Sequence, residues 1–256
     1  MKTWRRTAVA YWWRKRGRRL PRRTRKLVHG SRPVRWWRSK RKLRRSIRKA
    51  LKKAYYRVTV GERDRRRLRS AGALTPLRAF CRARPRGALP PDYTDLWFLY
   101  REVRRRRPET LLEFGSGCST VVLAFALCQN GAGHLWSLES DKGWSDATAA
   151  ALPDSLRPMV TLVHAPIRED DRDVQGWSYT NRPAVAPDLV YLDGPALTRE
   201  RKVAFDVLDL EPTLRPGCVV IVDGRGENVR YLEARLTRPH SFVVLPPWRS
   251  VFEFDA

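Results

Sequence analysis

Short apolar runs and amphipathic stretches alternate along the chain from residue 109 onward. The short runs are bounded by Gly, Asp or Glu and are typical of buried strands, whereas the longer stretches between them have helical spacing. We expect strands over 111–114, 135–138, 159–163, 189–192, 219–222, 242–245 and 251–254. We expect helices over 119–128, 145–152, 199–214 and 228–236, after a capped helix near 92–105 that follows Pro90-Pro91-Asp92.

Strands that alternate with helices predict a parallel sheet covered on both faces. The expected fold class is therefore α/β, a Rossmann-like doubly wound sheet of seven strands, mostly parallel. Such sheets bind ligands at the carboxyl ends of their strands. This rule selects the residues that follow the predicted strands, namely Gly115, Glu139, His164, Asp193 and Asp223. The segment 166–187 is expected to be a long loop at the same end and the place of acceptor contacts.

The charge is divided unevenly along the chain. Residues 1–107 carry a net charge of +34 and residues 108–256 carry −7, which together give the overall +27. Residues 1–40 mix Arg and Lys with Trp, and like charges at this density predict disorder. Apolar residues spaced by three or four predict an amphipathic helix near 41–58. We therefore place a basic, partly helical and partly disordered extension over 1–73 and the folded domain over 74–256.

Three interpretations of residues 1–60 remain open. Arg and Lys interleaved with Trp suit nucleic acid, through phosphate contacts and base stacking. The same pattern suits an anionic membrane surface. Alternatively, the true start lies downstream and the segment is a leader without a selected role. No apolar run has the length of a signal or a membrane span, so we expect a cytoplasmic protein, with peripheral membrane attachment as the alternative.

The four cysteines form no Cys-x-x-Cys pair and have no His at zinc-ligand spacing, which argues against a structural zinc site. They are Cys81, Cys118, Cys128 and Cys218. Reduced thiols are the simplest interpretation.

The strongest chemical signal is a glycine-containing turn between a predicted strand and a predicted helix. Its residues are Glu113-Phe114-Gly115-Ser116-Gly117-Cys118-Ser119-Thr120. Glycines at such a turn let the backbone approach a ligand, and the helix that follows offers unpaired N–H groups. Glu139 ends the next strand, 24 residues after Gly115, at the spacing of a carboxylate that binds ribose hydroxyls.

The order of these motifs resembles class I S-adenosylmethionine-dependent methyltransferases, in the subgroup with a Gly-x-Gly-x-Ser-Thr turn. Leu111 to Thr120 resembles the family's first motif, and Ser137-Leu-Glu-Ser-Asp141 its second. Asp188 to Pro195 resembles the fourth motif, and Leu214 to Asp223 the fifth strand with its lead-in. An NAD-binding protein fits less well, because only two of its three glycines are present.

The resemblance implies an enzyme with S-adenosylmethionine as cofactor and a defined set of site residues. The methionine moiety would lie over the glycine turn with Glu113 near its amino group, Glu139 would bind the ribose, and Asp193 would stand near the sulfonium. If the acceptor is a hydroxyl, a base must take its proton, and Asp193 and His164 are the catalytic candidates. The expected cofactor-binding residues are Glu113, Gly115, Ser116, Gly117, Ser119, Thr120, Glu139 and Ser140.

Simpler interpretations accompany each of these residues. The glycines can serve a tight turn alone, Asp193 can be a turn residue in Asp-Gly-Pro, and His164 can be a strand-end histidine without a chemical role. Asp193 and Asp223 permit a divalent metal but do not favour one, because the Asp-Asn pair of metal-dependent relatives is here Asp223-Gly224. No metal ligand is therefore predicted.

The acceptor is the feature of the protein that the sequence determines least. Asp193-Gly-Pro195 lacks the Pro-Pro-Tyr or Pro-Pro-Phe signature of enzymes that methylate base amines. We therefore expect methyl transfer to a hydroxyl of a small molecule or a saccharide. The alternative is a protein that binds RNA or an anionic membrane and whose methyltransferase-like domain acts on RNA or serves as a scaffold.

Overall fold

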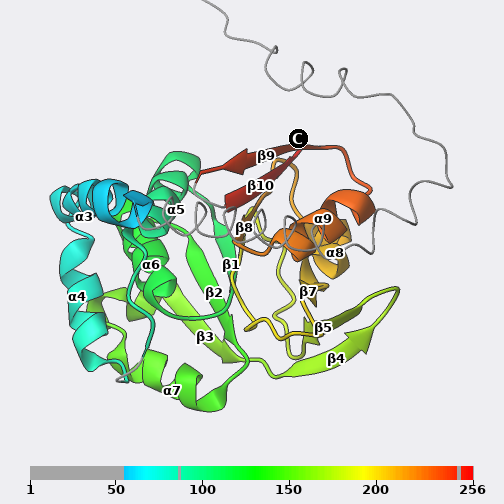
Figure 1. Cartoon of the computed structure of the whole chain (residues 1–256). Coiled ribbons are helices and arrows are strands. Elements are labelled where there is room, and N and C mark those ends of the chain that lie inside the picture. The colour runs from blue at the N-terminus through cyan, green and yellow to red at the C-terminus, as the bar shows by residue number, and fades with distance from the viewer. Residues whose placement is uncertain (1–54, 86–87, 247–248, 256) are drawn as a thin grey trace, which may run out of the picture. The chain divides into compact units, whose positions relative to one another are not determined.

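A computed structural model describes residues 55–85, 88–246 and 249–255 (Figure 1). The described residues from Tyr55 onward belong to one compact unit. Residues 1–54 lie outside the described part, and with them most of the predicted amphipathic helix and of the predicted basic extension. The proposed boundary between residues 73 and 74 stays a prediction. No helix of the described residues is both long and apolar enough to cross a membrane.

Seven strands of the described chain form a central sheet in the order β3-β2-β1-β6-β8-β10-β9 (Figure 1). The first five strands in this order pair in parallel, whereas β10 is antiparallel to both β8 and β9. The predicted mostly parallel seven-stranded sheet is confirmed. The strands are β1 (Thr110–Phe114), β2 (His134–Glu139), β3 (Val160–His164), β6 (Leu189–Leu192), β8 (Val219–Asp223), β9 (His240–Leu245) and β10 (Arg249–Phe254).

Alternating side chains of the central strands enter two separate hydrophobic clusters. In β1, Leu111 belongs to the first cluster, and Leu112 and Phe114 belong to the second. In β8, Val219 and Ile221 face the first cluster in the same way. This is the two-residue period of a sheet covered on both faces. The helices of the first cluster are α3 (Gly61–Ser70), α4 (Leu74–Ala83), α5 (Tyr93–Arg106), α6 (Cys118–Asn130) and α7 (Lys142–Ala151), and those of the second are α8 (Asp206–Leu210) and α9 (Gly226–Arg235).

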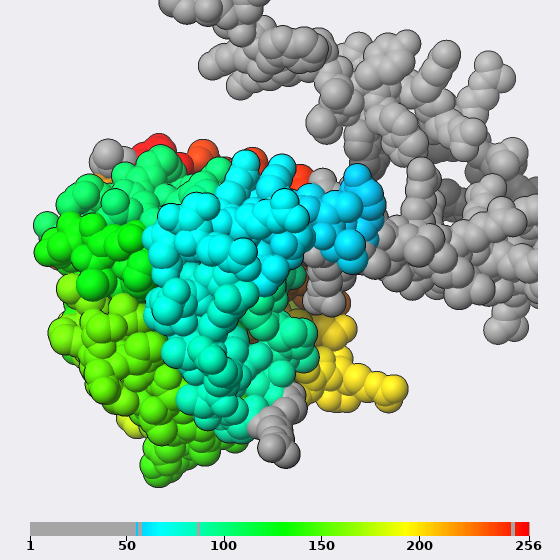
Figure 2. Space-filling model, turned by 90° about the vertical axis from the view of Figure 1, so that its left-hand side faces the viewer, coloured from blue at the N-terminus to red at the C-terminus, as the bar shows by residue number. Residues whose placement is uncertain are grey.

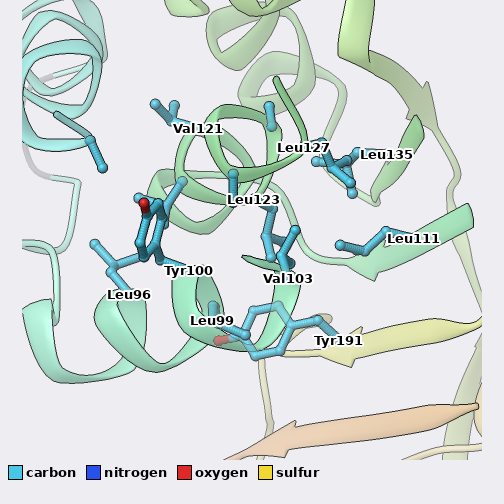
Figure 3. Packing of buried hydrophobic residues seen from close by; sticks show 14 of the residues in the cluster. Leu96, Leu99, Tyr100, Val103, Leu111, Val121, Leu123, Leu127, Leu135 and Tyr191 are labelled. Carbon is cyan, nitrogen blue, oxygen red and sulfur yellow. The ribbon is translucent and has the colours of Figure 1, made fainter. Parts of the chain in front are cut away.

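Helices α5 and α6 lie against the sheet with their apolar side chains interdigitated (Figure 3). Leu99 and Val103 of α5 and Leu127 of α6 are fully or almost fully buried. The α5 helix begins where Asp92 accepts a hydrogen bond from Thr94 N at 3.1 Å, as the predicted cap requires. This packing fixes the position of the α6 N-terminus, which directly follows the glycine turn.

Helices α3 and α4 cover the outer side of α5 and α6, and both are visible in cyan in Figure 2. Leu68 of α3 and Leu77 and Phe80 of α4 are buried in the first cluster. Helix α3 therefore packs with the unit that begins at Tyr55. A single turn of π-helix, Tyr56–Val60, leads into α3.

The prediction of a long loop over 166–187 is wrong for its first half. Residues Ile167–Asp171 (β4) and Gln175–Tyr179 (β5) form an antiparallel hairpin, and β5 pairs in parallel with Val203–Ala204 (β7) in a second, three-stranded sheet. The exposed strand β4 is rich in charged residues, which masked its strand character. Trp177 and Tyr179 on β5 are buried and hold the hairpin against the domain.

The predicted helix over 199–214 is also wrong in its length. Helix α8 spans only Asp206–Leu210 and continues as a short 3-10 turn, Glu211–Thr213. Val203 and Ala204 are extended instead, because they pair with β5. Another 3-10 segment, Asp154–Met159, leads into β3. The other predicted helices and strands are present, with ends displaced by a few residues.

Candidate active site

The turn after β1 brings two backbone segments into close contact. Gly115 has φ +97°, and its N–H donates to Leu138 O at 2.8 Å. A Cβ on Gly115 would lie 2.8 Å from Gly194 N, which is closer than side-chain carbons approach other atoms. Gly117 differs, because no atom lies within 4 Å of the place where its Cβ would be. The turn is therefore closed toward β6 and open at Gly117, where a ligand can approach the backbone.

Glu113 lies beneath this turn and is fully buried. Its Oε2 accepts hydrogen bonds from Thr120 Oγ1 and from Ser137 Oγ, both at 2.6 Å. Its Oε1 has no hydrogen-bond partner among the described residues. Burial raises the pKa of Glu113 to about 7, against the opposing effect of the nearby hydroxyl groups of Ser119, Ser137 and Thr120. A buried acceptor without a partner fits the ammonium group of the expected cofactor, as the resemblance implied.

Glu139 joins the turn to the end of β2 and is only 8% exposed. Its Oε2 accepts from Ser116 N at 3.0 Å and from Ser116 Oγ at 3.1 Å. Its Oε1 accepts from Asp141 N at 3.0 Å and from Ser140 Oγ at 3.3 Å. Each carboxylate oxygen can accept further hydrogen bonds, so Glu139 can still bind ribose hydroxyls while it holds the turn.

The eight predicted cofactor-binding residues therefore gather around one turn. Thr120 connects the glycine turn to Glu113, because its hydroxyl accepts a hydrogen bond from Gly117 N at 2.9 Å and donates one to Glu113. These residues lie together, and their contact with a cofactor stays a prediction.

Helix α7 contributes a contact that no sequence motif indicated. The indole Nε1 of Trp144 donates to Ser116 O at 2.9 Å, and Ser116 Oγ lies 3.3 Å from Thr148 Oγ1. The α7 helix is oriented by its cap, Asp141, whose side chain accepts from Trp144 N at 2.6 Å. The Asp141 cap was a readable helix signal, but nothing in the sequence indicated that Trp144 would turn back toward the glycine turn.

The two predicted catalytic residues lie far apart. Asp193 follows β6 and its N–H donates to Phe114 O at 3.0 Å, next to the glycine turn. His164 is exposed at the end of β3, the edge strand, and pairs in register with Glu139. Strands β2 and β1 separate β3 from β6, which corresponds to roughly 14 Å at the usual strand spacing. The two residues therefore cannot act on the same proton, and their catalytic roles stay predictions.

Asp193 has an exposed side chain and a raised pKa. Its side chain is exposed, yet the protein surrounds it closely enough that desolvation raises its pKa, while the charge of Arg225 opposes this effect. Arg225 is 4% exposed and holds the segment after β6 by donating to Asp193 O and Pro195 O. The Nη1 of Arg225 has no partner within the described part of the chain. Arg225 follows Asp223-Gly224 and could have been suspected from its place after a strand.

A second group that the sequence did not reveal lies at the N-terminus of α5. Asp95 Oδ1 lies 3.1 Å from Nη1 of the buried Arg249, which also donates to Thr94 O at 2.8 Å. Burial raises the pKa of Asp95 to about 8, and the neighbouring charges of Asp223 and Asp92 add to the effect. Because α5 precedes the first strand of the sheet, no motif connects Asp95 with the site. Asp95 and Asp193 nevertheless interact electrostatically.

Among the residues that the structure describes, no group of three or more His, Cys, Asp and Glu side chains is placed to hold a metal ion. Asp193 and Asp223, the pair considered for a metal in the sequence, are each accompanied by an arginine instead. Arg225 contacts the main chain at Asp193, and Arg249 pairs in register with Asp223 across β8 and β10.

Comparison with known proteins finds a family model that is similar to part of this chain. Residues 112–224 match the model of a protein family described as a methyltransferase domain. No curated protein matches the sequence. Similar solved structures include a methyltransferase from Geobacter sulfurreducens, with 15% identity, a TM-score of 0.49, and coverage of 72% of this chain and 90% of that one.

Two further similar structures are those of O-methyltransferases. TomG from Streptomyces achromogenes, in complex with SAM, has 18% identity and a TM-score of 0.45, with 70% of this chain and 90% of that one covered. The enzyme from Bacillus cereus, in complex with SAH, has 15% identity and a TM-score of 0.46, with 73% and 91% covered. The family match covers the glycine turn, Glu139 and Asp193, so the part of the chain that carries the candidate site is similar to a methyltransferase domain.

Proposed function

We propose that the protein transfers the methyl group of S-adenosylmethionine to a hydroxyl of a small molecule or a saccharide. Bound S-adenosylmethionine supplies an electrophilic methyl group on a sulfonium. The observation that carries the proposal is the place of Asp193, an exposed carboxyl with a raised pKa beside the glycine turn. A base with a pKa shifted toward neutrality is suited to accept a hydroxyl proton.

The residues of the site would divide the work as follows. Glu113 would hold the ammonium group of the cofactor and Glu139 its ribose hydroxyls, and the glycine turn would let the cofactor approach the backbone. Asp193 would take the proton of the acceptor hydroxyl as the C–O bond to the methyl group forms and the S–C bond to that methyl group breaks. Arg225 would keep Asp193 in place through the main chain. Alignment of the nucleophile with the methyl group is the main requirement of such a displacement.

The charged groups around Asp95 favour a polar acceptor over an apolar one. Its carboxyl, the Asp223 carboxyl and the Arg249 guanidinium lie together at the carboxyl end of β8, where an acceptor would enter. An acceptor with several hydroxyl groups can satisfy such donors and acceptors, whereas a purely apolar one would leave them desolvated without partners.

The experiment is a methyl-transfer assay with a panel of phenols, hydroxylated small molecules and oligosaccharides. Wild-type protein and an Asp193→Asn variant would be compared at equal cofactor saturation. We expect methylation of at least one hydroxylated class, with kcat reduced at least about 100-fold in the variant. Methylation confined to amines or thiols, or an unchanged kcat in Asp193→Asn, would contradict the proposal.

A second candidate function is binding of a polyanion, and a surface of the folded unit favours it. A groove of about 810 Å³ between α3 and α5 is lined by Arg63, Arg66, Arg67 and the stacked pair Trp97 and Tyr100. Glu62 also lines this groove, but the three arginines outnumber it, so the net charge of the lining is positive. Titration of RNA and of anionic vesicles at increasing salt tests it, because phosphate binding must weaken steeply with salt. Binding that is absent or insensitive to salt excludes this candidate.

A further inference from the structure

Two cysteines from different helices meet beside the glycine turn. Cys81 lies in the last turn of α4, and Cys118 is the first residue of α6, directly after Gly117. Their sulfur atoms are 3.8 Å apart, within the distance of a thiol hydrogen bond. Both side chains are partly exposed, so small reagents can reach them.

Arg84 completes this cluster. Its Nη1 lies 3.2 Å from the sulfur of Cys118 and donates to it. A hydrogen bond from Cys118, together with the charge of Arg84, lowers the pKa of Cys81 to about 7, against the opposing effect of burial. The same hydrogen bond, together with burial, raises the pKa of Cys118. The lowered pKa of Cys81 favours the thiolate, which is the form of cysteine that attacks a disulfide.

We propose that Cys81 and Cys118 are a redox modification site that closes to a disulfide and thereby weakens cofactor binding. A disulfide needs its two sulfurs at about 2.05 Å, so they must approach each other by nearly half of their present distance. The helices α4 and α6 already pack against each other, which brings the thiols together before any oxidation.

The reaction needs an oxidant, for which a small-molecule disulfide is sufficient. The Cys81 thiolate attacks one sulfur of that disulfide and releases one small thiolate. Cys118 then gives its proton to the released thiolate, attacks the Cys81 sulfur of the mixed disulfide and expels the second small thiolate, which takes up a proton from water. The two protein thiols lose two electrons, and the small disulfide is reduced to two thiols.

The effect on the cofactor site follows from the place of Cys118. The preceding residue, Gly117, is the open part of the turn, and its N–H is fixed by Thr120 Oγ1. Movement of the α6 N-terminus toward α4 would shift Gly117 and Thr120, and with Thr120 the hydroxyl that binds Glu113. A displacement below about 1 Å in a preorganised site is sufficient to lower affinity strongly. The effect rests on cofactor binding at this turn, whereas disulfide formation does not.

The test uses the full chain. A sample is treated with oxidised glutathione and then divided into two portions, one for each measurement. Peptide mass mapping without reduction identifies the cross-linked pair, and calorimetric titration with S-adenosylhomocysteine measures affinity before and after reduction with dithiothreitol. We expect a Cys81–Cys118 cross-link and affinity weaker by about tenfold, restored on reduction. Cys81→Ser should lose both effects, while Cys128→Ser, which removes an exposed cysteine elsewhere on α6, should retain both.

Absence of the cross-link in oxidised wild-type protein would overturn the modification site. A cross-link that leaves the affinity unchanged would overturn its coupling to the cofactor. Neither result depends on methylation of an acceptor, so a failure of the proposed function is recognised separately by the acceptor assay.

Discussion

Gly115, the first residue after β1, packs through its backbone against Gly194, the second residue after β6. This contact joins the predicted cofactor turn to Asp193. We expect Gly115→Ala to lower the free energy of unfolding by about 1–3 kcal/mol, since it adds a Cβ at a positive φ and in collision with Gly194. Thermal unfolding measures the loss.

Gly117→Ala is the matched comparison for this change. Its Cβ meets no atom within 4 Å, so packing is not disturbed, but the methyl group would occupy the open side of the turn. We expect binding of S-adenosylhomocysteine to weaken more than stability falls. Equal losses of stability in the two variants would show that the contact between Gly115 and Gly194 has no special importance.

Glu139→Gln should abolish measurable binding of S-adenosylmethionine and S-adenosylhomocysteine while the fold persists. The amide would replace one acceptor oxygen with a donor facing either Ser116 or Asp141. Calorimetric titration and circular dichroism together provide the test. Glu109→Gln, which changes an exposed carboxylate paired with Arg215, serves as control and should bind normally. Wild-type affinity in Glu139→Gln would remove Glu139 from the cofactor site.

Binding of the cofactor should release a proton near pH 6. The pKa of Glu113 is raised to about 7 by burial, so the carboxyl is largely protonated at pH 6, and a neighbouring ammonium would favour its ionised form. Titration in two buffers with different heats of ionisation measures the release. The released fraction should fall toward zero at pH 8.5 and should be lost in Glu113→Gln. Equal heats in both buffers at pH 6 would contradict this role of Glu113.

Asp95 should make the protein less stable as the pH rises from about 4 to 8. Its pKa is about 8 in the folded protein and near 4 when exposed, so the folded state binds the extra proton in this range and loses that advantage as pH increases. Asp95→Asn should reduce the decline in unfolding free energy by about 1–3 kcal/mol. Denaturant unfolding at pH 5 and pH 8 measures it. A variant that declines as steeply as wild type would show that Asp95 does not titrate in this range.

The sequence predicted the residues that follow strands and missed those that approach from elsewhere. Glu139 ends a parallel strand, and Gly115 and Asp193 directly follow one, so topology alone places all three at one edge of the sheet. Trp144 and Asp95 approach the same region from helices α7 and α5. The orientation of these helices depends on tertiary packing, which the hydrophobic periodicity of the sequence does not predict.

The inserted hairpin shows a second reason for failure. The strand β4 is exposed and carries Arg168, Glu169 and Asp170, which resemble a solvated loop in the sequence. Its strand character depends on pairing with β5, whose partner β7 lies more than twenty residues further along the chain. Long-range pairing of this kind overrides local composition. The same pairing shortens the helix that the sequence predicts from residue 199.

The position of β10 has a consequence for the order in which the chain folds during synthesis. Its Arg249 and Glu253 bond to Thr94 and Arg106 on α5, across 155 and 147 residues of sequence. The strand also lies between β8 and β9, so these three strands cannot assemble before it has been made. In a growing chain, the parallel strands can pair while α5 still lacks its two partners on β10. The docking of β10 on α5 closes a long loop, and we expect this step to limit the rate of folding.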